Sequence, residues 1–238
     1  MTDALAAPEQ NHLLAALPDT IKKRLFPHLK PVELKLGDVI YESGQPIDFV
    51  YFPTNCIISL LYVMLDGASA EISVVGNEGL VGVTVFMGGE STPSRAIVQS
   101  RGLAYRLPAQ DLRTEFNNHA EVRVLMLRYT QALITQMSQT AVCNRHHTID
   151  QQLCRWLLLS LDRLQDNRLT MTQELIANML GVRREGVTEA AGKLQKLGII
   201  EYHRGHITII DRPRLETLCC ECYAVVKRET DRLASSPR

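Results

Sequence analysis

Five polar residues between positions 183 and 193 have side chains that can hydrogen-bond to the bases and phosphates of a nucleic acid. They are Arg183, Arg184, Thr188, Glu189 and Lys193. Arginine and lysine donate to guanine and phosphate oxygens, and a threonine hydroxyl bonds to either kind of base edge. Helical spacing puts them opposite a set of apolar residues, which comprises Val187, Ala190, Ala191 and Leu194. The pattern predicts a helix whose outer face can enter the major groove of double-stranded DNA.

The residues around this helix are typical of a helix-turn-helix. Thr172 is a good N-cap for a preceding helix, and Gly181 falls where the chain must turn sharply. The small residue Ala177 and the apolar Val187 have the spacing at which two such helices cross closely. Two β-branched runs then flank Arg204, which predicts a hairpin, or wing, with this arginine at its tip.

The zero net charge of the 238-residue chain hides a small asymmetry. Residues 1–147 carry 12 basic and 14 acidic side chains, whereas residues 148–238 carry 14 basic and 12 acidic ones. Residues 183–214 alone hold 7 basic and 4 acidic side chains, which favours an anionic partner. A hydrophobic fraction of 45% excludes a disordered chain, and the sequence has no membrane span or export signal. We therefore expect a soluble, cytoplasmic protein without a membrane partner.

The elements that position these residues change character along the chain. Helical spacing at 13–29 is followed by short β-branched runs with glycine turns, which predict a small barrel or sandwich. The stretch 111–144 has neither glycine nor proline and predicts a long helix, and a capping-box pattern at Thr148 begins the next helix. We expect an α+β fold in four segments: an N-terminal β-roll of jelly-roll type (1–110), a dimerisation helix and hinge (111–147), a winged helix-turn-helix (148–215) and a tail helix (216–238).

An apolar stripe on the long helix predicts self-association. Its members step by three or four residues and are Met126, Tyr129, Leu133, Met137 and Ala141. A helix of about 25 residues is roughly 37 Å long, which is more than one small barrel covers. A second copy of the chain is the expected partner, and packing on the chain's own barrel is the alternative.

The six cysteines suggest buried thiols rather than disulfides in a cytosolic protein. Cys143, His146 and His147 share a helical face and could hold zinc, but the sequence offers no obvious fourth ligand, so no metal is expected. The other notable group, Cys219, Cys220 and Cys222, fits a buried tail helix, with thiol sensing as the alternative. An enzyme that uses Cys143 with a nearby histidine is disfavoured, because the chain has no phosphate loop or serine elbow.

Five runs of sequence resemble the Crp–Fnr family of bacterial transcription regulators. They are LGVRREGVT (180–188), LQKLGII (194–200), RGHITIID (204–211), GDVIYESGQP (37–46) and NEGLVG (77–82). The resemblance covers about residues 13–215. It implies a cyclic-nucleotide-binding-like β-roll, a dimerisation helix and a winged helix.

The resemblance also implies roles for single residues. Arg184 and Glu185 match the family's base-reading Arg-Glu pair, and Thr172 matches a phosphate-contacting position. Glu189 stands where some members have a second base-contacting arginine, so the family's usual operator sequence is not expected. The N-terminal cysteines that hold an iron–sulfur cluster in Fnr-type members are absent, and no cofactor is expected.

The effector region departs from the members that bind cyclic AMP. Those members carry a Gly-Glu pair for the ribose and an Arg-Ser-Ala run for the phosphate. Here Gly82-Val83 lacks the carboxylate, and Ser94-Arg95 has the arginine one place late. A one-residue slip in a strand turns a side chain to the other face, so cyclic AMP is not the expected effector.

We therefore expect a homodimeric, sequence-specific DNA-binding regulator of transcription that responds to an unknown small molecule and contacts RNA polymerase if it activates. Two alternatives stay open. One is a protein-interaction module on the same fold, and the other is a redox-responsive regulator that uses the C-terminal cysteines.

Overall fold

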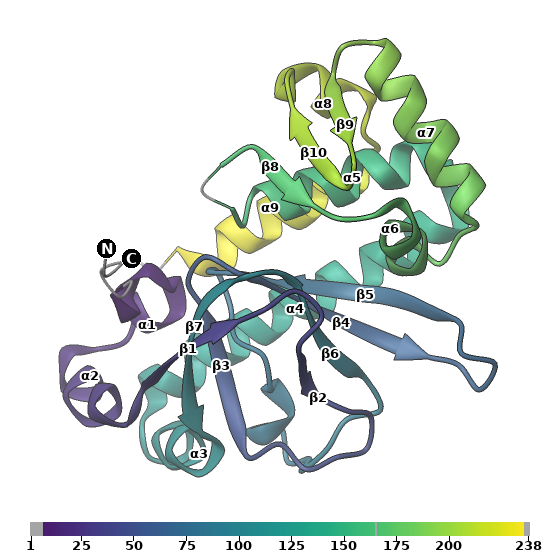
Figure 1. The fold of residues 1–238 in the computed structure, drawn as a ribbon. Helices are drawn as coiled ribbons and strands as arrows, with labels where there is room; N and C mark the ends of the chain where they lie inside the picture. Colours follow the sequence, from purple (N-terminus) through teal and green to yellow (C-terminus); the bar gives the residue numbers. More distant parts are fainter. Residues whose placement is uncertain (1–6, 165, 236–238) are drawn as a thin grey trace. The chain divides into compact units, whose positions relative to one another are not determined.

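The computed structural model describes residues 7–164 and 166–235. The chain folds as two compact units, of which the first holds the described residues up to Leu60 and Val75–Gln131. The second unit holds Leu61–Val74 and the described residues from Ala132 onward. Figure 1 shows the helices and strands of both units.

The first unit is a β-roll bordered by helices. Its short N-terminal helices are η1 (Pro8–Gln10), α1 (His12–Ala15), α2 (Asp19–Leu25) and η2 (Phe26–His28). The strands that follow are β1 (Lys30–Leu34), β2 (Val39–Tyr41), β3 (Phe49–Pro53), β4 (Ile57–Val63), β5 (Ser69–Val75), β6 (Arg95–Ser100) and β7 (Gly102–Pro108). The remaining helices are η3 (Val83–Val85), α3 (Ala109–Asn118) and α4 (Ala120–His146), and α4 continues into the second unit.

Two antiparallel sheets form the β-roll, with strand orders β1-β7-β3 and β2-β6-β4-β5. Val50 and Leu107 lie opposite each other in the β3–β7 register, and both are fully buried. The fold class expected from the glycine-punctuated strands, an α+β protein with an N-terminal β-roll, is confirmed. Leu61–Val74, which includes the end of β4 and nearly all of β5, belongs to the second unit.

The N-terminal helical pattern at 13–29 is divided into separate short helices. Pro18 is extended (φ −57°, ψ 146°) and is the N-cap of α2, since proline cannot continue the preceding helix. Asn11 holds α1 on the β-roll: its side-chain Nδ2 donates to the carbonyls of Pro53 (2.9 Å) and Gly79 (2.8 Å). Its Oδ1 accepts from two amides at the start of α1, so this buried amide has partners at both ends.

The segment expected to be one dimerisation helix is two helices. His119 leaves the helical conformation (φ −127°, ψ 116°) between α3 and α4. Arg24 forms two hydrogen bonds of 2.9 Å with the carboxylate of Glu115 near this junction. This pairing lowers the pKa of Glu115. The 27-residue α4 agrees in length with the expected long helix.

The predicted apolar stripe is not exposed along its length: Met137 is partly buried and Ala141 is exposed, but the expectation is wrong for Met126, Tyr129 and Leu133. All three are buried, because this face of α4 packs inside the chain, and the Tyr129 hydroxyl donates to the carbonyl of Leu80 (2.8 Å). The exposed apolar residues of α4 lie on a neighbouring face, which we call the outer stripe. It consists of Val124 (51% exposed), Leu127 (48%), Ile134 (53%) and Val142 (47%).

The second unit is built around helix α5. Its elements after α4 are α5 (Ile149–Leu161), β8 (Arg168–Thr170), α6 (Gln173–Leu180), α7 (Arg184–Lys196), β9 (Ile200–His203), β10 (His206–Ile209), α8 (Arg212–Leu218) and α9 (Glu221–Ala234). The predicted capping box of Thr148 and Gln151 is confirmed at the start of α5. Gln152–Leu161 is buried throughout, so α5 is a core helix rather than one with a single apolar side.

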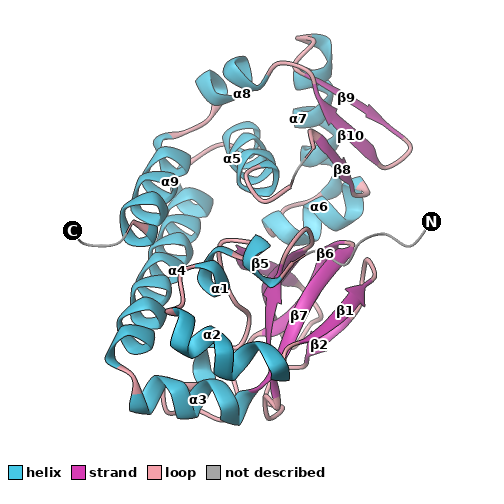
Figure 2. Cartoon of the chain, turned by 90° about the vertical axis from the view of Figure 1, so that its left-hand side faces the viewer, coloured by secondary structure: helices cyan, strands magenta, loops and turns pink. Residues whose placement is uncertain are grey.

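The tail helix expected at 216–238 is α9, which buries Cys222, Tyr223 and Val226. Residues 236–238 of that expected segment lie outside the described residues. Among the described residues, none of the helices has the length and hydropathy needed to cross a bilayer. Figure 2 shows α9 beside the end of α4.

We expect Gly79→Ala to destabilise the protein by about 1–3 kcal/mol, the usual cost of overpacking. A Cβ at this position would lie 2.4 Å from the ring of Tyr129, which is buried and hydrogen-bonded. Gly192 in α7 is the matched control, because a Cβ there meets no atom within 4 Å. Gly192→Ala should instead gain up to about 1 kcal/mol from helix propensity. Thermal unfolding of both variants tests this, and equal midpoints would contradict the packing.

Candidate nucleic-acid interface and cysteine cluster

Helices α6 and α7 form the predicted helix-turn-helix. Thr172 caps α6, and its hydroxyl oxygen accepts from the amide of Leu175 (3.2 Å). Gly181 ends α6 in the left-handed conformation (φ 65°, ψ 35°), which glycine adopts without strain. Ala177 and Val187 are buried between the helices, as their spacing predicts. The predicted N-cap at Thr172, turn at Gly181 and close helix contact at Ala177 are therefore confirmed.

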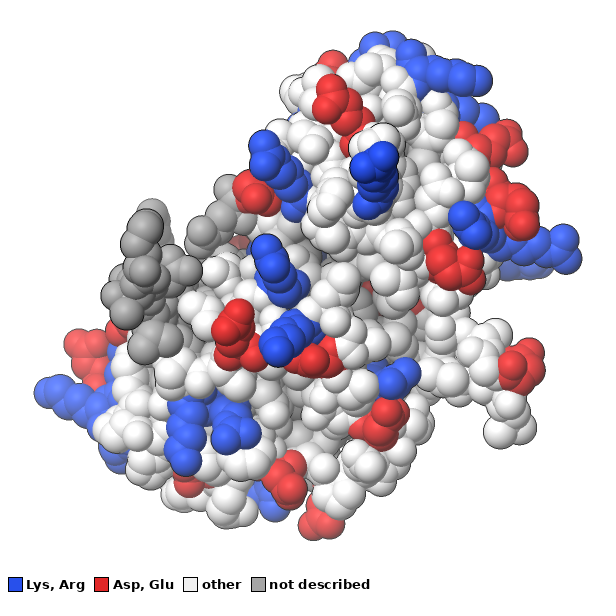
Figure 3. Space-filling view, in the orientation of Figure 1, with Lys and Arg blue, Asp and Glu red and all other residues white. Residues whose placement is uncertain are grey.

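The first turn of α7 presents charged side chains to the exterior. Arg183 is the N-cap residue, Arg184 is the first helical residue and Glu185 follows, and all three are exposed. The backbone amides at a helix N-terminus also point outward and favour anions. Figure 3 shows basic side chains over α7 with acidic ones among them. This turn can donate hydrogen bonds to a phosphate or a base edge.

The other predicted DNA-contacting residues of α7 already have partners within the protein. The Thr188 hydroxyl lies 2.7 Å from Gln173 Oε1 and 3.0 Å from the carbonyl of Arg184, and its one proton can be donated to either oxygen. Lys193 Nζ lies 3.0 Å from both Asp150 Oδ2 and Glu189 Oε1. These hydrogen bonds raise the pKa of Lys193. A phosphate would have to replace two carboxylates at Lys193, whereas Arg183 and Arg184 are exposed at the helix start.

The wing is a three-stranded sheet of order β8-β10-β9. Arg204 is exposed at the β9–β10 turn and has a positive φ of 49°, a conformation uncommon outside glycine. The Gly205 carbonyl accepts from the Met171 amide (2.7 Å), and the Tyr202 hydroxyl donates to the Met171 carbonyl (2.7 Å). These bonds fix the hairpin next to the start of α6. Strand β8 is a part of the wing that sequence patterning missed, because a three-residue strand has too few positions to show alternation.

The predicted effector region has two parts. Gly82 and Val83 lie at the start of η3, and Ser94 and Arg95 lie where β6 begins. Gly82 is left-handed (φ 110°), and a Cβ there would lie 3.0 Å from Val50. Val83 begins η3 and is partly buried. Backbone hydrogen bonds hold the loop between η3 and β6, and one of them runs from the Gly44 amide to the Thr92 carbonyl (2.8 Å).

Arg95 lies on the opposite face of β6 from the fully buried Ala96. Its Nε is 3.1 Å from Glu42 Oε2, so the guanidinium is paired with a carboxylate. Ser94 is buried, and its hydroxyl lies 3.0 Å from that of Thr92. The structure thus pairs Arg95 with an anion of the protein itself.

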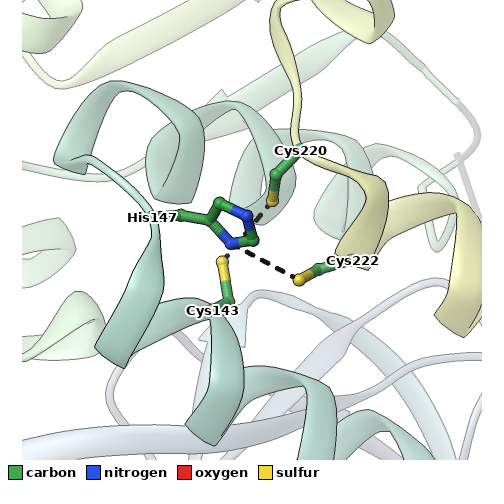
Figure 4. A group of neighbouring side chains, drawn as sticks. All are labelled: Cys143, His147, Cys220 and Cys222. Carbon is green, nitrogen blue, oxygen red and sulfur yellow. Dashed lines mark hydrogen bonds between the residues drawn. The ribbon is translucent and has the colours of Figure 1, made fainter.

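A cluster of ligand-type side chains joins the end of α4 to the start of α9. Cys143 and His147 come from the end of α4, Cys220 is the N-cap of α9, and Cys222 lies in its first turn. The four ligand atoms all lie within 4.8 Å of one another (Figure 4). The sequence spacing groups Cys143 with His146 and His147, but His146 is exposed. The missing partners are Cys220 and Cys222, about 75 residues away, and their Cys-x-Cys spacing was the available signal.

The cluster changes the acidity of its thiols. Hydrogen bonds from Cys143 and Cys219 lower the pKa of Cys220. The hydrogen bond to Cys220, followed by burial, raises the pKa of Cys143, and burial is the main cause of the raised pKa of Cys222. Outside the cluster, burial raises the pKa of both Cys56 and Cys154 to about 12. Those two thiols are therefore unreactive core residues.

Two family models match the chain. A cyclic nucleotide-binding domain matches residues 31–119, and a Crp-like helix-turn-helix domain matches residues 151–218. The first model covers most of the β-roll, and the second covers α5 and the winged helix-turn-helix. No curated protein sequence matches the chain.

Solved structures with the same fold come from several bacteria. FixK2 from Bradyrhizobium japonicum has a TM-score of 0.70 at 17% identity over 81% of this chain and 98% of its own. A CRP-family transcriptional regulator from Thermus thermophilus has a TM-score of 0.66 at 16% identity over 79% and 95%. The c-di-GMP responsive global regulator CLP from Xanthomonas campestris has a TM-score of 0.61 at 14% identity over 81% and 99%.

At these identities the neighbours establish a shared fold. The family models add evidence from the sequence, because a cyclic nucleotide-binding domain is followed along the chain by a Crp-like helix-turn-helix domain. The protein is therefore a member of the Crp–Fnr family, with the fold of its DNA-binding transcriptional regulators.

Proposed function

We propose that this protein is a homodimeric, sequence-specific DNA-binding regulator of transcription in the cytoplasm. The observation that carries the proposal is the first turn of α7, where Arg183, Arg184 and Glu185 are exposed on a helix-turn-helix. Thr172 and Arg204 flank this turn as further contacts to the DNA backbone. An activator of this kind would also contact RNA polymerase.

The outer stripe of α4 supports self-association. Leu127 and Ile134 are one heptad apart, and each is about half exposed. Apolar residues at this spacing are typical of paired helices. A dimer would set two recognition helices about one duplex turn apart, as a near-palindromic operator requires.

The effector region supports a ligand other than a cyclic mononucleotide. Val83 has no acceptor for a ribose hydroxyl, and Arg95 is paired with Glu42. CLP is described as c-di-GMP responsive, so this dinucleotide belongs among the compounds to test. The effector pocket proposed here remains the region of Gly82, Val83, Ser94 and Arg95.

A second candidate is regulation through thiol oxidation, in which a peroxide accepts the two electrons and two protons that two thiols lose when they form a disulfide. The sulfur atoms of Cys143 and Cys220 are 3.6 Å apart, which is close enough for a disulfide after a small side-chain rotation. The zinc content of the purified protein distinguishes a redox pair from a metal site. A pure protein-interaction role would leave the exposed arginines of α7 without a use.

Arg184→Ala should weaken binding to a selected operator duplex by about 1–3 kcal/mol and relax its sequence preference. The loss should exceed that of Lys193→Ala, because Lys193 is shared between two carboxylates. Lys227→Ala in α9 is the control for charge alone, since it removes an exposed cation outside the interface. Fluorescence anisotropy at several salt concentrations measures the three variants. Unchanged operator affinity in Arg184→Ala would exclude this recognition face.

Ile134→Glu should convert the dimer to a monomer, since it places a charge in the centre of the apolar outer stripe. Asn144→Glu, at an exposed position on another side of α4, should remain dimeric. Sedimentation equilibrium of both variants provides the measurement. A dimeric Ile134→Glu variant with native stability would mean that chains pair through a different surface.

Cyclic AMP and cyclic GMP should give no binding heat at micromolar concentrations. The physical reason is that neither a ribose-binding carboxylate nor a free arginine is available at Val83 and Arg95. Isothermal titration calorimetry with both compounds and with c-di-GMP tests this. A micromolar dissociation constant for either mononucleotide would refute the assignment.

A further inference from the structure

We propose that Cys143, His147, Cys220 and Cys222 bind one zinc ion that joins the end of α4 to the start of α9. Cysteine and histidine are the preferred ligands of zinc, and sets of three cysteines and one histidine form structural sites. The spacing Cys-x3-His on one segment and Cys-x-Cys on the other supplies two ligands from each side. This inference does not depend on the proposed regulatory function.

The distances agree with a single tetrahedral ion. With Zn–S near 2.3 Å and Zn–N near 2.0–2.1 Å, tetrahedral geometry gives S···S of about 3.8 Å and S···N of about 3.6 Å. Here Cys143 Sγ lies 3.6 Å from Cys220 Sγ, and Cys222 Sγ lies 3.6 Å from His147 Nδ1. The whole set lies within 4.8 Å, which leaves space for one metal atom rather than for a cluster of several.

The histidine is oriented as a metal ligand. Its Nδ1 faces Cys222, and its Nε2 lies 3.3 Å from the carboxylate of Glu221 (Figure 4 shows the ring among the sulfur atoms). A zinc-bound histidine commonly donates its second ring N–H to a carboxylate, which fixes the tautomer. Glu221 is the residue between Cys220 and Cys222, so one short segment provides two ligands and this support.

The surroundings favour thiolates. Cys220 and Cys222 lie at the N-terminus of the 14-residue helix α9, where the helix dipole stabilises negative charge. Arg155 is 3% exposed and within electrostatic range of Cys143 and Cys219. Its Nη1 donates to Thr140, and its buried Nε has no acceptor in the described part of the chain. Three thiolates and Zn²⁺ leave one negative charge, which the buried guanidinium offsets.

A disulfide explains less of this arrangement. A Cys143–Cys220 bond would use two of the thiols and leave Cys222 and His147 facing each other without a role. Zinc accounts for all four side chains and requires no oxidant, because binding only displaces the remaining thiol protons. With four protein ligands the site is closed, so its role is structural rather than catalytic.

The test is the zinc content of the full-length protein, purified without metal-affinity resin or chelators and measured by plasma mass spectrometry. We expect about one zinc per chain in the parent protein. His147→Ala and Cys222→Ala should each weaken zinc binding by more than the roughly 10–100-fold loss of affinity typical of a supporting residue, so both variants should retain far less than one zinc per chain after purification. His146→Ala, the adjacent exposed histidine, and Cys154→Ala, a buried cysteine outside the cluster, should retain the zinc.

Measurements on the parent protein cover the case in which a ligand variant does not fold. A mercurial reagent should release the zinc as the thiols react, and Co²⁺ exchange should give the absorption of a tetrahedral thiolate site. Zinc-free parent protein without these Co²⁺ bands would refute the proposal, as would full zinc content in a folded His147→Ala variant. A Cys143–Cys220 disulfide in protein kept under reducing conditions would instead identify a redox pair. None of these readouts requires DNA binding.

Discussion

The burial of α5 is the constraint on which the second unit depends. Ten consecutive residues, Gln152–Leu161, are buried, so this helix must be covered on all sides. Helices α7, α8 and α9 and strand β8 pack against it. Because the apolar side of α7, with Val187 and Leu194, faces inward, its charged side has to face outward. The exposure of Arg184 is thus a consequence of core packing.

The charges in each of the two units are balanced rather than strongly positive. Glu189 and Asp150 hold Lys193, and Glu42 holds Arg95, so two predicted anion-binding cations are partly neutralised by the protein itself. Exposed ion pairs of this kind contribute little to stability, but they reduce the attraction for any polyanion. Any attraction for a polyanion in this part of the chain then comes mainly from the exposed arginines in the first turn of α7.

The cysteine cluster brings together two distant segments of the second unit. Helix α9 follows the winged helix-turn-helix in sequence, and its N-terminus returns to the end of α4, next to the capped start of α5. A metal at this point would connect segments about 75 residues apart and restrict the junction before the DNA-binding helices. Helix α5 contacts both α7 and α9, so the same core helix supports this junction and the exposed face of α7.

The sequence by itself determined the features that depend on near neighbours. The caps at Thr148 and Thr172 and the left-handed Gly181 are local, because a side chain or a backbone angle satisfies them within a few residues. The two domains of the family can also be recognised from contiguous runs of sequence. Tertiary structure decided which apolar face of α4 is buried, since Met126 and Leu127 are equally apolar and only packing separates them. It also decided that His147 rather than His146 meets Cys220 and Cys222, because no local rule relates side chains so far apart in the chain.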